Sequence, residues 1–230
     1  MNVLLFGATG MVGQGALREC LLADDVTRVQ TVGRTPSGQQ HPKLHELVHQ
    51  DLFDYSAVEG ELRNFDACFF CIGVSSSGMA EADYTRLTYE LTLATAGTLA
   101  RLNPQMTFVY VSGAGADSSE TSKTMWARVR GRTENALQRL PFKAVYVFRP
   151  GIIQPLHGIR SKTGSYRWFY TLASPLLPLL RRLMPNTVLS TQLVGQAMLN
   201  VARRGAAAPG QTRAVLEAAQ ISAIGRSAAA

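Results

Sequence analysis

The sequence predicts an α/β protein built on a Rossmann-like, doubly wound parallel sheet. Short apolar runs of strand length alternate along the chain with longer segments whose apolar residues recur at helical spacing. Several of these runs are apolar throughout, which is typical of strands that helices bury on both faces. A glycine-rich segment follows the first run directly. Together these observations favour a parallel sheet with helices on both faces.

The expected elements follow this alternation in order along the chain. We expect strands at 3–6, 29–32, 44–48, 67–72, 108–111 and 144–148, and a late strand at 215–217. We expect helices at 11–22, 80–102, 122–140 and 191–202, a loop at 205–210 and a frayed tail at 225–230. With 230 residues, the chain is expected to form one domain, with a small C-terminal cap contributed mainly by 151–190.

The composition describes an ordinary globular protein with a moderate basic excess. Hydrophobic residues make up 46% and charged residues 17%, which excludes a disordered chain or a coiled coil. Lys and Arg number 23 against 16 Asp and Glu, a net charge of +7. This excess suits an anionic ligand. Because the basic residues are scattered along the chain, we expect no nucleic-acid partner.

The cysteines and the N-terminus lead us to expect a cytoplasmic location. Cys20, Cys68 and Cys71 are too few for a disulfide framework, and the first residues do not resemble a signal peptide. Cys68 and Cys71 form a C-x-x-C pattern, but two phenylalanines separate them within an apolar strand. Buried core cysteines are therefore favoured over redox chemistry, and we predict no metal site.

The segment after the first strand has the pattern of a pyrophosphate-binding turn. Glycines allow a tight turn and a close approach of the backbone to a ligand, and the N–H groups at a helix start attract negative charge. The alternative is a simple glycine-rich turn. The context of a strand before and a helix after favours dinucleotide binding by Gly7, Thr9, Gly10, Met11, Val12 and Gly13.

The ends of later strands carry further candidate cofactor residues. No carboxylate follows the second strand, where an acidic residue would contact a ribose 2′-hydroxyl, and Arg34 stands there instead. A forked guanidinium suits a 2′-phosphate, so we expect NADP(H) to be favoured over NAD(H). Asp51 and Leu52 are candidates for the adenine side, although a turn Asp is an equal alternative. Cys71, Ile72 and Gly73 should border the cofactor after the fourth strand.

These motifs, with Tyr110–Ala116 and Val147–Gly151, resemble the short-chain dehydrogenase/reductase superfamily in its atypical or extended form. The resemblance covers most of the chain. It is to Tat-interacting-protein-like oxidoreductases and to bacterial epimerase-like NAD(P)-binding proteins. It implies a nicotinamide cofactor and places Pro150 and Gly151 on its nicotinamide side.

The resemblance also implies a catalytic serine, tyrosine and lysine, and only the serine is present. Ser112 occupies the serine position, whereas Trp126 stands for the tyrosine and Arg130 for the lysine. An indole does not exchange protons usefully, and an arginine stays charged, so Trp126 is no substitute for a phenol. The alternative is that Trp126 is a buried helix residue and the alignment is offset. None of the seven tyrosines has a lysine four residues later.

Two functions and one surface remain open from the sequence. The chain either reduces or epimerises a small substrate by a non-standard proton route, or it binds the nucleotide as a sensor. His157 is the one histidine expected near the substrate pocket. Basic residues flank an apolar stretch within 160–182, which is interpreted as a lid, a protein interface that includes a possible homodimer, or a peripheral membrane contact.

Overall fold

The computed structural model describes residues 1–159, 187–204 and 212–227. Its centre is a parallel sheet in the order β3-β2-β1-β4-β5-β6-β9. The strands are β1 (Asn2–Phe6), β2 (Arg28–Gly33), β3 (Leu44–Val48), β4 (Ala67–Phe70), β5 (Thr107–Val111), β6 (Ala144–Arg149) and β9 (Arg213–Glu217). Each expected strand is present, and the predicted fold class is confirmed.

The helices agree with the sequence pattern less closely than the strands do. They are α1 (Met11–Leu22), the 3-10 helix η1 (Ser56–Leu62), α2 (Glu81–Thr85), the π-helical η2 (Arg86–Glu90), α3 (Leu91–Leu102), α4 (Met125–Leu137), α7 (Thr191–Arg204) and α8 (Ala218–Arg226). The helix expected at 80–102 therefore contains a π-helical turn. The tail expected at 225–230 is partly wrong, because α8 continues to Arg226.

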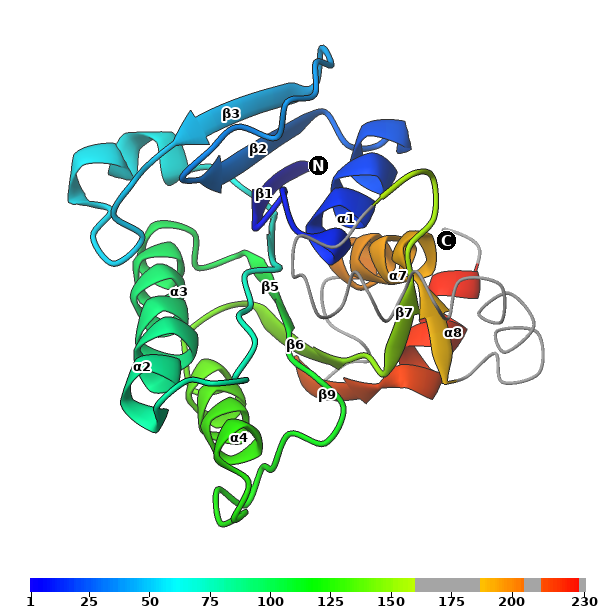
Figure 1. The fold of residues 1–230 in the computed structure, drawn as a ribbon. Coiled ribbons are helices and arrows are strands. Elements are labelled where there is room, and N and C mark those ends of the chain that lie inside the picture. Colours follow the sequence, from blue (N-terminus) through cyan, green and yellow to red (C-terminus); the bar gives the residue numbers. More distant parts are fainter. Residues whose placement is uncertain (160–186, 205–211, 228–230) are drawn as a thin grey trace.

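Alternate side chains of the strands supply two apolar cores, one on each face of the sheet. From β1, Val3 and Leu5 join a cluster that includes residues of α1, α7 and α8. Leu4 and Phe6 join the opposite cluster, which includes residues of η1, α3 and α4. Figure 1 shows these two groups of helices on opposite sides of the sheet. Burial on both faces explains why the strand sequences are apolar throughout.

A second, smaller sheet lies beyond β6. Strand β7 (Ile152–Gln154) pairs in parallel with β8 (Val188–Ser190), and the short apolar runs in these segments gave no clear strand pattern. This pair belongs to the expected cap at 151–190. The segment 160–182 and the loop 205–210 lie outside the described residues. Among the helices of the described residues, none has the length and apolar character needed to cross a membrane.

The order of the strands determines where a ligand can bind. All seven strands of the main sheet are parallel, so their carboxyl ends meet at one edge. The chain runs outward from β1 to β3 and then returns to place β4 on the other side of β1. Ligands of open α/β sheets bind beyond the carboxyl ends, at the point where the strand order reverses.

Candidate functional site

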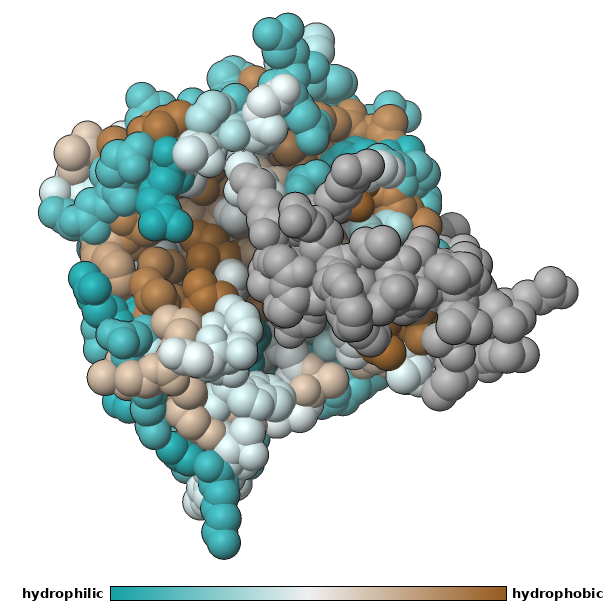
Figure 2. Space-filling view, viewed as in Figure 1, coloured by the Kyte–Doolittle hydropathy of each residue, from teal (hydrophilic) through white to brown (hydrophobic). Residues whose placement is uncertain are grey.

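A cavity of about 1040 Å³ opens at this carboxyl edge. Segments that follow β1, β2, β4, β5 and β6 line it, together with residues of α2 and α4. Figure 2 shows hydrophobic residues gathered on this face, between the region of β2 and β3 and the helices α2 and α4. The volume lies at the upper end of the range that small-molecule and cofactor sites occupy. The cavity is large enough for a dinucleotide.

The glycine-rich segment that follows β1 forms one wall of the cavity. Gly7 turns with φ +78°, a region that favours glycine, and its carbonyl oxygen accepts a hydrogen bond from Gly10 N at 2.9 Å. Gly10 caps α1, and no side chain supplies a capping hydrogen bond there. The first N–H groups of α1 are thus left for a ligand, and the helix dipole favours an anionic one. Of the six predicted residues, Gly7, Thr9, Gly10, Met11 and Val12 line the cavity.

Gly13 is the exception, because it packs inside the protein. A Cβ at Gly13 would lie 2.1 Å from the carbonyl oxygen of Gly7. The glycine therefore lets α1 approach the turn after β1 closely, and it does not line the cavity.

The end of β2 brings Arg34 to the cavity, but Asp51 does not reach it. Arg34 and Thr35 both line the wall, and Arg34 is exposed. Leu52 lines the cavity as expected. The Asp51 carboxylate instead accepts a hydrogen bond from Phe53 N at 2.9 Å, which is the turn interpretation left open by the sequence. Asp51 thus differs from the predicted cofactor residues Arg34 and Leu52 in that it does not line the cavity.

The residues after β4 form the next part of the wall. Cys71, Ile72 and Gly73 line the cavity, followed by Val74, Ser75 and Ser76. Burial raises the pKa of the Cys71 thiol to about 12, and that of Cys68 well above its ordinary value. Thiols in this state are poor nucleophiles. In the described part of the chain, no group of three or more His, Cys, Asp or Glu side chains could hold a metal ion.

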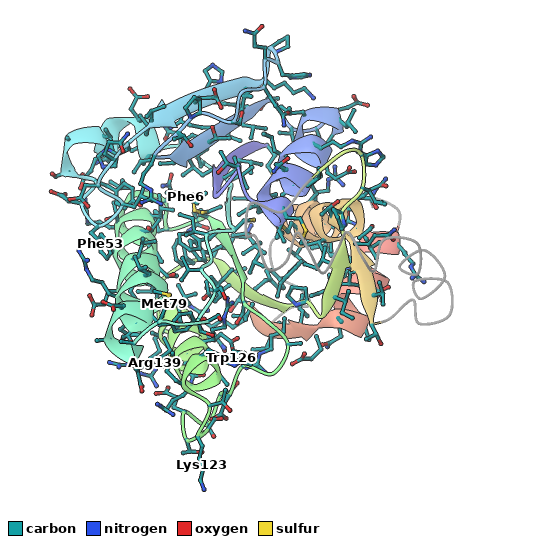
Figure 3. The ribbon with its side chains drawn as sticks, in the orientation of Figure 1. Phe6, Phe53, Met79, Lys123, Trp126 and Arg139 are labelled. Carbon is teal, nitrogen blue, oxygen red and sulfur yellow. The ribbon has the colours of Figure 1, made fainter. Side chains whose placement is uncertain are left out.

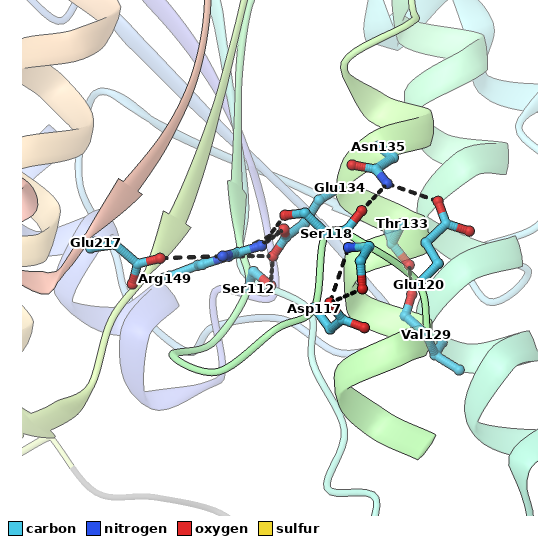
Figure 4. A network of polar contacts seen from close by, with 11 residues as sticks. Ser112, Asp117, Ser118, Glu120, Val129, Thr133, Glu134, Asn135, Arg149 and Glu217 are labelled. Carbon is cyan, nitrogen blue, oxygen red and sulfur yellow. Dashed lines mark hydrogen bonds and ion pairs between the residues drawn. The ribbon is translucent and has the colours of Figure 1, made fainter. Parts of the chain in front are cut away.

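Ser112 lies in the cavity wall, but its hydroxyl proton is already engaged. The hydroxyl donates to the Glu134 carboxylate at 2.5 Å, and Glu134 is fully buried. The carboxylate also forms a two-nitrogen ion pair with Arg149, whose Nε lies 3.1 Å from Oε1 (Figure 4). In this arrangement Ser112 offers a substrate only an acceptor oxygen. The role of carbonyl donor implied by the family resemblance requires this bond to break.

Trp126 and Arg130 line the same wall from the first turns of α4. Figure 3 labels Trp126 where this helix begins. A Cβ at Gly115, in the loop after β5, would meet the Trp126 ring at 3.2 Å, so the indole packs against that loop. The Arg130 guanidinium lies between two glycine turns, because Cβ atoms at Gly73 and Gly113 would stand 3.7 and 3.8 Å from its Nη2 and Nη1.

The sequence pattern missed Tyr84, a phenol that faces Arg130. Its hydroxyl accepts a hydrogen bond from Arg130 Nε at 3.0 Å, and both residues line the cavity. Their separation of 46 positions gives no local motif. Only the packing of α2 on α4 brings them together.

The cavity is completed by the segment after β6. Pro150 and Gly151 line it, as the family resemblance implies, and Ile153 adds an apolar contact. His157 does not line it, and its Nε2 lies 3.4 Å from the Gln192 side chain. Further lining residues that the sequence analysis did not name as site residues are Ala8, Thr31, Val32, Gly33, Val111, Gly113 and Ala114.

The chain is similar in sequence to curated proteins from fungi and from the rat. The chain is 31% identical over 159 residues to protein fmp52, mitochondrial, of Emericella nidulans, covering 66% of each chain, so the match spans about two thirds of that relative. It is 26% identical over 200 residues to protein HTATIP2 of Rattus norvegicus, covering 81% of each. No protein-family model matches the chain.

Solved structures share the fold at low sequence identity. Glucuronic acid dehydrogenase from Chromohalobacter salexigens superposes with a TM-score of 0.64 at 17% identity, over 94% of this chain and 75% of that one. The Bordetella bronchiseptica enzyme WbmF, solved with NAD+, gives 0.66 at 14% identity, over 97% and 76%. The chain belongs to the short-chain dehydrogenase/reductase superfamily, in its atypical branch, and has the Rossmann-like fold of NAD(P)-binding dehydrogenases.

One prediction from the sequence is wrong on this comparison. We expected a cytoplasmic location, but the Fmp52 relatives from several fungi are named mitochondrial proteins. They point to the mitochondrion rather than the cytoplasm. A low cysteine content indicates only that stable disulfides are not expected, and it does not by itself identify the cytoplasm.

Proposed function

We propose that the protein is an NADP(H)-dependent oxidoreductase that acts on a small carbonyl compound. One observation carries this proposal: a single cavity joins an uncapped helix start, an arginine at the end of β2 and a polar group made of Ser112, Tyr84 and Arg130. The first two features suit the phosphates of a dinucleotide. The polar group lies at the carboxyl ends of β4 and β5, where the reacting part of a bound dinucleotide would lie.

The preference for NADP(H) rests on Arg34. It is exposed at the cavity wall beside Thr35, and no carboxylate lines this part of the cavity among the described residues. A guanidinium pairs with a 2′-phosphate through charge-assisted hydrogen bonds. Its hydrogen bonds to an uncharged 2′-hydroxyl would be weaker. Such a bond contributes about 1.5–3 kcal/mol.

Different residues of this chain would hold different parts of the cofactor and the substrate. A bound nicotinamide dinucleotide supplies or accepts a hydride. The N–H groups at the start of α1 hold its pyrophosphate, and Arg34 holds the 2′-phosphate. Arg130 offers its Nη groups, since only its Nε has a hydrogen-bond acceptor among the residues that the structure describes. These donors suit the ribose hydroxyls or a substrate oxygen.

The first test is binding. Titration of the purified protein should give a lower Kd for NADPH than for NADH, and Arg34→Ala should reduce the difference by roughly 10- to 100-fold. Arg139→Ala is the matched control, because Arg139 is exposed and does not line the cavity. Equal affinity of the wild-type protein for both nucleotides would refute the NADP(H) preference.

The second test is turnover. NADPH oxidation across a panel of aldehydes and ketones supports an enzyme. Saturable NADPH binding without turnover on any member supports the alternative of a nucleotide-sensing protein, which the tryptophan in place of the family tyrosine favours. Absence of nucleotide binding would contradict both.

A further inference from the structure

Among the residues that the structure describes, the cavity contains one phenol that could replace the missing family tyrosine. Of the tyrosines that the structure describes, Tyr84 alone lines the cavity, and its side chain is 1% exposed. Tyr110 is also buried but does not line it. A proton donor is therefore present in the folded cavity, although the sequence has tryptophan at the position where the family carries tyrosine.

The partner of this phenol is the arginine at the position of the family lysine. Arg130 Nε donates to the Tyr84 hydroxyl at 3.0 Å, and the guanidinium extends from there over the glycine turns that follow β4 and β5. A cation beside a phenol stabilises the phenolate that remains after proton transfer. Because the guanidinium keeps its charge, it can perform this role without exchanging a proton itself.

Contacts on both sides fix the two residues against each other. The Arg128 guanidinium forms two 2.8 Å hydrogen bonds with the Glu81 carboxylate, and Arg132 lies over the Tyr89 ring with 4.3 Å to its centroid. These pairs bind α4 to α2 and to η2 on either side of the Tyr84–Arg130 contact. The π-helical turn begins two residues after Tyr84, and such turns are frequent at functional sites.

Other charged and titratable groups surround the pair. Burial by itself lowers the pKa of Arg130, but the phenols of Tyr110 and Tyr84 and the carboxylate of Glu134 raise it. Burial raises the pKa of Tyr110 to about 12, so Tyr110 holds its proton. The Glu134 carboxylate is occupied by Ser112 and Arg149. Among these groups, Tyr84 is the phenol that both faces the cavity and contacts a cation.

We propose that Tyr84 is the proton donor of the reaction and that Arg130 stabilises its phenolate. This inference rests on the proposed oxidoreductase function. A bound reduced nicotinamide dinucleotide would supply the hydride to the carbonyl carbon and would itself be oxidised. Tyr84 would give its phenolic proton to the carbonyl oxygen, so that an alcohol forms. Solvent then returns a proton to the phenolate. The active phenol thus comes from α2, whereas the family tyrosine would come from α4.

Kinetics provide the first test. Tyr84→Phe keeps the ring and should lower kcat by roughly 10²- to 10⁴-fold, with the Kd for NADPH unchanged. Tyr89→Phe is the matched control, since it removes a phenol from the same helical segment outside the cavity and keeps the ring under Arg132. Wild-type turnover that survives in Tyr84→Phe overturns the role of Tyr84 and leaves the proposed function standing. A wild-type protein that binds NADPH but reduces no carbonyl overturns the proposed function and this inference with it.

A second measurement needs neither cofactor nor turnover. In protein labelled with ¹³C at tyrosine Cζ, the Tyr84 resonance is assigned by its loss in Tyr84→Phe, and its chemical shift reports the hydrogen bond at the hydroxyl. Arg130→Gln should shift the Tyr84 resonance at neutral pH, because the hydrogen bond from Arg130 Nε is removed. The resonance of Tyr55, whose hydroxyl bonds to Thr95, should not shift. An unchanged Tyr84 resonance in Arg130→Gln would overturn the role of Arg130.

Discussion

At the residue scale, glycines within helices differ in what surrounds them, and three of them illustrate the difference. A Cβ at Gly13 in α1 would stand 2.1 Å from the Gly7 carbonyl oxygen, and one at Gly131 in α4 would stand 1.6 Å from the Asp117 carbonyl oxygen. At Gly97 in α3, a Cβ would meet nothing within 4 Å. The first two glycines let a backbone approach closely, whereas the third only weakens its helix.

This difference gives a prediction about stability. Gly97→Ala should raise the free energy of unfolding by about 0.5–1 kcal/mol, since alanine restricts the unfolded chain and favours the helix. Gly13→Ala and Gly131→Ala should lower it by about 1–3 kcal/mol, because the new methyl group displaces backbone. Urea denaturation of the three variants measures this. The same sign of change for all three would show that the close contacts are not real.

The sequence predicted only part of this local chemistry. Gly13 could be predicted from its place in the turn motif, whereas nothing local to Gly131 indicated a contact with the loop after β5. Arg34 was predicted at the cavity because strand ends of a parallel sheet meet at one edge. Tyr84 was not predicted, because its contact depends on how α2 packs against α4.

At the element scale, a buried ion pair connects α4 to the end of β6. Glu134 is 0% exposed, and Arg149 bonds it through two nitrogens and also reaches Glu217 at 3.2 Å at the end of β9 (Figure 4). A buried carboxylate is costly unless it is paired and hydrogen-bonded. The Val147–Gly151 motif, from which the family resemblance was drawn, thus contains a structural residue, Arg149, beside the cavity residues Pro150 and Gly151.

Removing one member of this ion pair should strongly destabilise the folded protein. Arg149→Ala leaves Glu134 buried without its cation and should lower the free energy of unfolding by about 3–5 kcal/mol. The double variant Glu134→Leu/Arg149→Met removes both charges and should recover much of that loss. The control is Arg63→Ala, which removes an exposed partner of Glu59 at 3.8 Å and should change little. A small effect of Arg149→Ala would contradict the importance of the pair.

The loop between β5 and α4 depends on a single carboxylate. Asp117 accepts hydrogen bonds from Ser119 N and Oγ and from the backbone of Thr121 and Ser122, at 2.6 to 3.0 Å. The bonds from Ser119 and Ser122 lower the pKa of Asp117 from 3.8 to about 2. Because the pKa is lowered, the loop is stabilised above about pH 3.8, and this contribution is lost as pH falls towards 2.

Hydrogen exchange tests this dependence at single amides. The N–H groups of Thr121 and Ser122 should exchange faster in Asp117→Asn at neutral pH, since a neutral amide is a weaker acceptor than a carboxylate. In the wild-type protein their protection should fall between about pH 4 and pH 2. Asp24→Asn is the control, because Asp24 is an exposed carboxylate far along the chain from this loop. Unchanged protection in Asp117→Asn would show that the backbone alone holds the loop.

The element scale also shows where sequence patterns are sufficient. The inner strands of the main sheet were predicted almost at their observed bounds because burial on both faces leaves continuous apolar runs, whereas the edge strands β3 and β9 are only partly buried. The helix at 80–102 was predicted as one element, because a π-helical turn keeps the apolar spacing nearly intact. Strands β7 and β8 were not predicted, since each has three residues and its partner is distant in sequence.

At the scale of the whole molecule, the cavity joins parts of the chain that are far apart in the sequence. The glycine turn and Arg34 come from the half of the sheet that contains β1 and β2, and Ser112 and Pro150 come from the half that contains β5 and β6. A ligand that contacts both halves binds the folded protein and has no comparable site in the unfolded chain. Its binding free energy is therefore added to the free energy of unfolding.

The last prediction follows from this linkage. NADPH at about 100 times its Kd should add about 2.7 kcal/mol, which for a chain of this size raises Tm by roughly 5–10 °C. Gly10→Asp should abolish the rise, because it places a negative charge at the helix start that we propose holds the pyrophosphate. Gly60→Asp is the control, since a Cβ at Gly60 meets nothing within 4 Å and Gly60 does not line the cavity. Differential scanning calorimetry of the three proteins, with and without NADPH, separates loss of ligand binding from loss of fold. A rise in Tm that persists in Gly10→Asp would place the pyrophosphate away from α1 and require another binding mode in the cavity.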